Sequence, residues 1–178
     1  VREAIRELAA MGVLDFEPHK GARVREVGCL ETIQALQVRS ALEPLAARLA
    51  GERILRHCQT LRAASAAILT AARTRDFIAF QESNQEFHRT IVEAARNPVL
   101  LRLWSSLAFE VRTRFIMDYL ETADPIAIAL EHEPIIEAFE AGAIEEAAGL
   151  LARHSENLVS YLESQSAQSP AASADAVL

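Results

Sequence analysis

Cysteine, glycine, proline and long apolar runs are all scarce in this sequence, and each scarcity excludes a class of protein. Cys29 and Cys58 are the only cysteines, too few for a disulfide framework and without zinc-finger spacing, so a reducing, cytoplasmic location is expected. Six glycines and six prolines among 178 residues leave long stretches that favour helices. No apolar run reaches the roughly 18 residues of a membrane span, and the first residues do not form a signal peptide, so no membrane partner is expected.

Acidic residues outnumber basic ones, but not evenly along the chain. The net charge is −7, which taken alone argues against binding to nucleic acid. Residues 1–25 nevertheless carry +1, with five basic side chains against four acidic ones: Arg2, Arg6, Lys20, Arg23 and Arg25 against Glu3, Glu7, Asp15 and Glu17. A near-neutral head and an acidic body of charge −8 are therefore interpreted separately.

The head, residues 1–27, has the pattern of a helix followed by a β-hairpin. Residues 1–11 predict a helix that Gly12 ends, and 13–16 and 22–27 predict two short strands joined by a turn at 18–21. A helix followed by a hairpin is the second half of a winged helix. Because helical pattern is present from the first residue, we expect an N-terminal portion to precede it.

The body, residues 31–164, has only helical pattern, so the fold class is mainly α: a partial winged helix followed by an antiparallel six-helix bundle. The predicted helices are 32–54, 56–73, 75–96, 98 to about 120, 125–142 and 143–164. The first carries a stripe expected to face the core, formed by Val38, Leu42, Leu45 and Leu49. The tail, residues 165–178, is small and polar, and is expected to be disordered.

Four polar residues lie on apolar stripes of three predicted helices: Asn84, His88, His132 and His154. At 100° per residue, Asn84 and His88 are neighbours one turn apart on the face formed by Phe80, Phe87 and Ile91. Three imidazoles and an amide that converge inside a bundle predict a metal site with positions open for water or an anion. The alternative is that each histidine is a hydrogen-bonded core residue.

A catalytic interpretation is disfavoured. On a continuous helix Glu131 and Glu133 flank His132 but point away from its face, and the sequence has no HExxH motif to supply a general base. We therefore expect a protein that is not an enzyme. Two further alternatives remain open, a sensor in which the metal itself is the signal and a plain helical interaction module.

Residues 1–27, VREAIRELAAMGVLDFEPHKGARVREV, resemble the end of the winged helix-turn-helix of GntR-type transcriptional regulators. VRSALEPLAARLA and NQEFHRTIVEAARNPVLLRLW resemble the helical effector domain of the FadR subfamily, the FCD domain. The resemblance covers about residues 1–163. It implies a homodimer whose full-length form binds palindromic operator DNA and responds to a small organic acid.

The resemblance also implies a metal site. In metal-binding members the ligands are Asp-x3-His on one helix and one His on each of two later helices, which matches Asn84, His88, His132 and His154 except for the asparagine. A divalent transition metal is expected, with zinc favoured and nickel, manganese or iron as alternatives. Asn84 leaves the full charge of the metal in place, which weakens metal binding and strengthens attraction for a carboxylate.

Basic residues supply the remaining predicted contacts. The resemblance places Arg2 and Arg6 on the DNA-reading helix, and Lys20, Gly21 and Arg23 at the wing tip near phosphates. An effector carboxylate favours a guanidinium partner. The candidates are Arg39 beside the first bundle stripe, and Arg112 and Arg114 on the fourth bundle helix.

Overall fold

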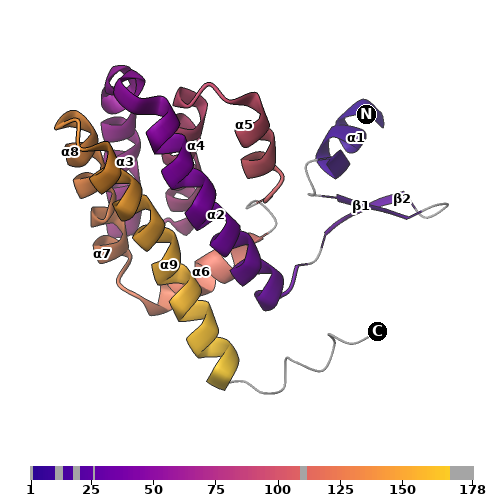
Figure 1. The fold of residues 1–178 in the computed structure, drawn as a ribbon. Coiled ribbons are helices and arrows are strands. Elements are labelled where there is room, and N and C mark those ends of the chain that lie inside the picture. Colours follow the sequence, from indigo (N-terminus) through magenta and orange to yellow (C-terminus); the bar gives the residue numbers. More distant parts are fainter. Residues whose placement is uncertain (1, 11–13, 18–20, 26, 109–111, 169–178) are drawn as a thin grey trace.

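A helix and a two-stranded hairpin form the head in the computed structural model, which describes residues 2–10, 14–17, 21–25, 27–108 and 112–168. Helix α1 spans Arg2–Ala10, and strands β1 (Leu14–Glu17) and β2 (Gly21–Val24) pair antiparallel, with Leu14 opposite Val24. Gly21 has φ +95°, a conformation that side chains with a Cβ rarely adopt. The head stands beside the helical body and joins it through the segment before α2 (Figure 1).

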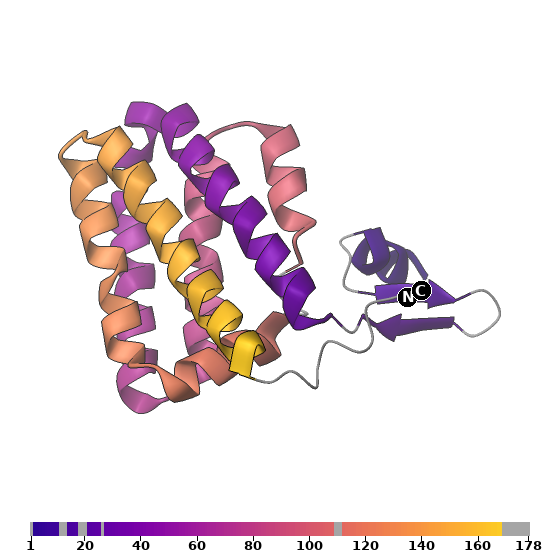
Figure 2. The same ribbon diagram turned by 60° about the horizontal axis from the view of Figure 1, so that its bottom comes forward.

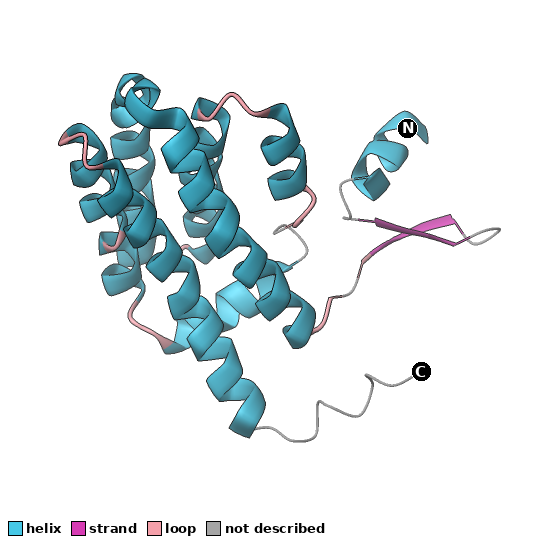
Figure 3. Cartoon of the chain, in the orientation of Figure 1, coloured by secondary structure: helices cyan, strands magenta, loops and turns pink. Residues whose placement is uncertain are grey.

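Helices make up the rest of the described chain (Figures 2 and 3). Their bounds are α2 Cys29–Ala50, the 3-10 helix η1 Gly51–His57, α3 Cys58–Thr74, α4 Phe77–Ala94, α5 Pro98–Ser105, α6 Thr113–Thr122, α7 Pro125–Leu130, α8 His132–Glu140 and α9 Ile144–Gln168. Three begin at side chains that cap backbone N–H groups, Asp76, Asn97 and Asp124, and proline follows the last two as the first helical residue. The predicted mainly α fold class is confirmed.

The core of the body lies where α2 packs along α9 and α3 along α4 (Figure 1). Its largest completely buried side chains include Trp104, Phe87 and Phe139. Burying one such side chain stabilises the fold by roughly 1.5–3 kcal/mol, so these three anchor α5, α4 and α8. None of the helices in the described part of the chain is long and apolar enough to cross a membrane.

Two predicted helices are each divided, so the six-helix expectation was wrong in number. The helix predicted from residue 98 to about 120 ends after Ser105, and Ala108 adopts φ +48°, which does not continue a helix. The helix predicted at 125–142 is interrupted at Glu131. Pro134 lacks the N–H that would bond the carbonyl of Leu130 in a continuous helix. Helix α9 continues to Gln168, past the predicted end at residue 164, and residues 169–178 of the expected tail lie outside the described residues.

The apolar stripe predicted to face the core from α2 points outward instead. Val38, Leu45 and Leu49 are 48%, 43% and 40% exposed, whereas the fourth predicted member, Leu42, is half-buried and packs against the core. The buried face of α2 holds mostly smaller or charged residues, among them Ala46, Ala47 and the pair Arg39 and Glu43. The spacing was correct for one helical face, but that face is not covered by the chain's own core.

Candidate functional site

Three helices bring the four predicted polar residues together. Asn84 and His88 lie one turn apart on α4, His132 is the first residue of α8, and His154 lies on α9. Each of the three histidines offers a ring nitrogen, and these nitrogens all lie within 4.8 Å of one another. His88 and His132 are completely buried, and His154 is largely buried. The convergence inferred from helical spacing is thus present in the fold.

Each histidine has its Nδ1 atom next to an oxygen. His88 Nδ1 lies 2.9 Å from Oε2 of Glu43, His132 Nδ1 lies 3.0 Å from the carbonyl oxygen of Ala129, and His154 Nδ1 lies 2.7 Å from Oε2 of Glu131. An oxygen beside Nδ1 favours the ring proton on that nitrogen, which leaves Nε2 as the nitrogen with a lone pair. This arrangement is the one that histidine ligands adopt around metals.

The environment keeps the buried imidazoles neutral. Burial, the charge of Arg39 and repulsion from His154 outweigh Glu43 and lower the pKa of His88 to about 4. Burial, followed by repulsion from His154 and His88, holds the pKa of His132 well below its usual value. Neutral imidazoles have the lone pairs that metal binding requires.

The contact between Asn84 and His132 brings two hydrogen-bond acceptors together, which favours a cation beside them. Its Oδ1 lies 2.8 Å from His132 Nε2. With the imidazole proton at Nδ1 and directed to Ala129, the two atoms are both acceptors. Their approach is favourable with a cation beside them, unless the amide rotates to present its NH2 group. The donor set of one amide and three imidazoles therefore fits a transition metal.

Glu43 is a buried participant that the sequence interpretation missed. Burial alone would raise its pKa, but the charge of Arg39, the adjacent His88 and a hydrogen bond from Trp104 hold the pKa far below its usual range. Its Oε1 accepts from Arg39 Nε at 2.6 Å and from Trp104 Nε1 at 2.9 Å. The one available signal was its i,i+4 spacing from Arg39.

Glu131 corrects a second expectation, because it points toward the site rather than away from it. Its backbone keeps right-handed helical dihedral angles, and its carboxylate reaches α9, where it accepts from His154 Nδ1 at 2.7 Å and from Asn157 Nδ2 at 2.9 Å. Glu133, its predicted counterpart, instead pairs with Arg62 near the surface. Glu43 and Glu131 are thus the two carboxylates that lie beside imidazoles of the cluster.

A cavity of about 40 Å³ adjoins the cluster, room for about three water-sized groups. Asn84 and His154 reach it from the cluster, Arg39, Tyr119 and Glu131 add polar groups, and the remaining lining is mainly apolar: Leu36, Phe80, Ile116, Leu120, Ile128, Ser155 and Leu158. Burial raises the pKa of Tyr119, so its hydroxyl stays a hydrogen-bond donor. Of the predicted effector-binding arginines, the structure places Arg39 at this cavity.

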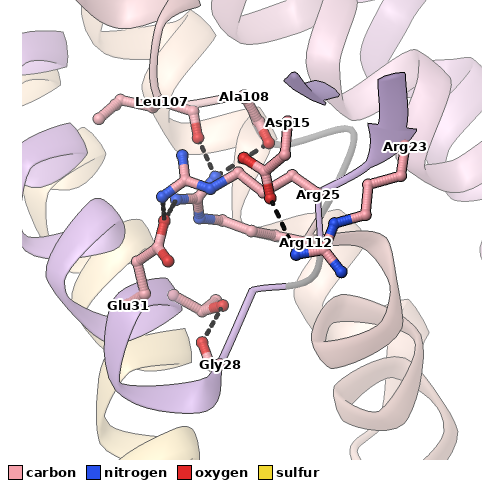
Figure 4. Close-up of polar contacts among 9 residues, drawn as sticks. Asp15, Arg23, Arg25, Gly28, Glu31, Leu107, Ala108 and Arg112 are labelled. Carbon is pink, nitrogen blue, oxygen red and sulfur yellow. Dashed lines mark hydrogen bonds and ion pairs between the residues drawn. The ribbon is translucent and has the colours of Figure 1, made fainter. Parts of the chain in front are cut away.

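Arg112 lies elsewhere, at the junction of the head and the body (Figure 4). It is buried, it bonds the carbonyl oxygens of Leu107 and Ala108, and its Nη2 lies 3.0 Å from Oε1 of Glu31. The same Glu31 oxygen lies 2.8 Å from Arg25 Nη2. The structure therefore does not bring Arg112 to the cavity. The side chain of Arg114, also predicted to bind effector, lies outside the described residues.

The predicted DNA contacts lie in the head. Arg6 is exposed on α1, and Gly21 and Arg23 are exposed on β2. Arg23 Nη2 lies 3.9 Å from Asp15 on the neighbouring strand. Lys20 and the side chain of Arg2 lie outside the described residues. The structure thus leaves the DNA-contact role of all five as a prediction.

Comparisons with known proteins agree on one family. A family model described as the FCD domain matches residues 34–157. A Paenarthrobacter nicotinovorans protein, described as a probable D-xylose utilization operon transcriptional repressor, is 40% identical over 155 residues, 86% of this chain and 68% of its own.

Solved structures share the fold, and one of those compared is described as a transcriptional regulator. Escherichia coli McbR/YncC matches with a TM-score of 0.76 and 21% identity, covering 93% of this chain and 84% of that one, a likeness that shows the fold alone. A GntR-family transcriptional regulator from Pseudomonas syringae pv. tomato matches with a TM-score of 0.58 and 28% identity, covering 95% and 70%.

Proposed function

Because this chain belongs to the GntR-type transcriptional regulators with an FCD domain, we propose that it is a repressor whose affinity for operator DNA is set by a small organic acid bound beside a metal. The observation that carries the proposal is the set of three imidazole nitrogens within 4.8 Å of one another, next to a cavity that Arg39 lines. The relative's description as a repressor supports the direction of regulation.

Asn84, His88, His132 and His154 would hold the metal. When bound, it supplies a concentrated positive charge that attracts an anionic ligand. Nε2 is the nitrogen of each histidine that is left for it, because every Nδ1 lies beside an oxygen. Asn84 adds no charge, so zinc or another divalent transition metal would keep its full charge for the effector.

The chain's own residues shape the effector site. Arg39 and the protonated Tyr119 hydroxyl offer donors to a carboxylate. The apolar lining excludes water and suits a short hydrocarbon body. A cavity of about 40 Å³ admits little more than the carboxylate end, so binding of the whole acid requires the surrounding helices to shift. Through such a shift of the helices, ligand binding would change the DNA-binding head.

A second copy of the chain is the proposed occupant of the exposed stripe on α2. Val38, Leu45 and Leu49 differ by seven and four residues, so they form one narrow apolar face. The same face repeated on a partner related by two-fold symmetry is complementary to itself. Two heads would then meet two half-sites of a palindromic operator, with Arg2, Arg6, Lys20, Gly21 and Arg23 at the DNA.

Elemental analysis and native mass spectrometry of the purified protein would test the metal and the dimer together. We expect about one divalent metal per chain and a dimer mass. In full-length protein, operator affinity is then measured against a panel of organic acids. The neutral sugar D-xylose is tested beside them because of the relative's description. Operator affinity that no acid changes would refute the effector proposal. A response to metal alone would instead establish the metal as the signal.

A further inference from the structure

Glu43 has two oxygens with different partners. Arg39 and Trp104 both donate to Oε1, while Oε2 lies 2.9 Å from His88 Nδ1. Arg39, Trp104 and Glu43 are all buried, and the Arg39 guanidinium also lies over the Trp104 ring. A role confined to joining α2 and α5 would need Oε1 alone. Oε2 therefore requires its own explanation.

The contact to His88 selects one of two tautomers. A neutral imidazole carries one proton, and a carboxylate beside Nδ1 attracts it to that nitrogen. The other tautomer would set the Nδ1 lone pair against a carboxylate and turn an N–H toward His132 and His154. Arg39 compensates the charge of Glu43, so that the carboxylate remains ionised in a buried position.

We propose that Glu43 is a positioning residue that holds His88 with its proton on Nδ1, so that Nε2 presents its lone pair to the centre formed with Asn84, His132 and His154. The inference rests on the proposed metal site and adds a residue that lies outside the donor set. It makes α2 part of that site, although α2 supplies no ligand. Glu131 makes the equivalent contact to His154, with 2.7 Å between its Oε2 and Nδ1 of the imidazole.

The test compares Glu43→Gln with the wild-type protein. The glutamine keeps the shape and one acceptor oxygen for Arg39 and Trp104, but its amide NH2 donates to His88 Nδ1 and moves the ring proton to Nε2. Nitrogen-15 NMR of the metal-free protein distinguishes the two tautomers of His88. Zinc affinity, measured by competition with a chromophoric chelator, is expected to fall about 10- to 100-fold.

Trp104→Phe is the matched control. It removes a donor to Oε1 and leaves the contact between Oε2 and His88, so we expect lower stability with an unchanged His88 tautomer and unchanged zinc affinity. Should Glu43→Gln fail to fold because Arg39 loses its partner, the double variant Arg39→Gln/Glu43→Gln removes both charges and is measured in the same way.

The outcomes separate this inference from the proposed function. A folded Glu43 variant whose His88 proton stays on Nδ1 overturns the inference, whatever happens to zinc affinity. Unchanged zinc affinity after the tautomer has moved overturns it as well. Wild-type protein that binds no zinc refutes the proposed metal site, while the metal-free NMR comparison still decides what Glu43 does to His88.

Discussion

Glu31 and Arg112 join the start of α2 to the start of α6, with 3.0 Å between Oε1 and Nη2. Arg112 is buried, whereas Glu31 is partly exposed and also contacts Arg25 of the segment leading to the head. We predict that Glu31→Gln lowers the free energy of unfolding by about 1–2 kcal/mol, because a buried guanidinium loses its charged partner. Urea denaturation measures the change.

The exposed pair of Arg48 and Glu145 is the control for that comparison. Its side chains are largely solvated, so Arg48→Gln should change stability by less than about 0.5 kcal/mol. Equal effects of the two substitutions would mean that burial of Arg112 adds nothing to the contact.

Stability of the metal-free protein should fall as the pH is lowered from 6.5 to about 4. His88 binds a proton in the folded state only near pH 4, while the unfolded chain binds it near 6.5. The unfolded state therefore holds more protons across this window, and the loss attributable to His88 is on the order of 3 kcal/mol. Urea denaturation with a chelator present, at a series of pH values, measures the slope.

His88→Gln should flatten that slope, and His132 should account for part of what remains because its pKa is also lowered. Gln59→Ala, a change of a side chain that cannot titrate at an exposed position outside the cluster, should leave the slope as it is in wild type. If His88→Gln leaves the slope unchanged, the imidazole of His88 is not held neutral by the fold.

Asn84→Asp should raise zinc affinity by about tenfold or more, because a carboxylate brings charge as well as an oxygen to the donor set. The same change should weaken the binding of an anionic effector, since the net positive charge beside the cavity falls. Chelator competition measures the metal, and calorimetry with an organic acid measures the effector. Ser83→Asp adds the same charge one position away and should have a far smaller effect on both affinities.

Leu45→Glu should convert the proposed dimer to a monomer, because it puts a charge in the middle of the exposed stripe on α2. Sedimentation velocity measures the association state. Ile78→Glu replaces a more exposed apolar residue on α4 and should leave the dimer intact. A dimer that survives Leu45→Glu would place the interface on another face.

The apolar stripe on α2 shows what helical periodicity can and cannot predict. The spacing of Val38, Leu45 and Leu49 correctly groups them on one face, but periodicity alone cannot say whether that face is covered by the same chain or by another. Small alanines and an ion pair form the buried face instead, and charged residues are rarely assigned to a core from sequence. The burial of Glu43 depends on Trp104, which lies 61 positions away in the sequence.

The four polar residues could be predicted because each stands out on an apolar helical face. The residues that orient them could not, since Glu43 and Glu131 look like ordinary surface acids in the sequence. Glu131 reaches His154 because α9 packs beside the junction of α7 and α8, and periodicity within one helix does not say which helix lies next to it. The local sequence pattern thus predicts the candidate metal ligands, whereas the residues that orient them come together only in the tertiary structure.

The carboxylate of Glu131 has a consequence for protein design. Neighbouring residues on an unbroken helix diverge by 100°, yet Glu131 and His132 both serve the same cluster. Copying only Asn84, His88, His132 and His154 onto another helical bundle would reproduce the donors and leave His154 without its carboxylate. Glu131 would have to be copied with them, although it is not itself one of the four donors.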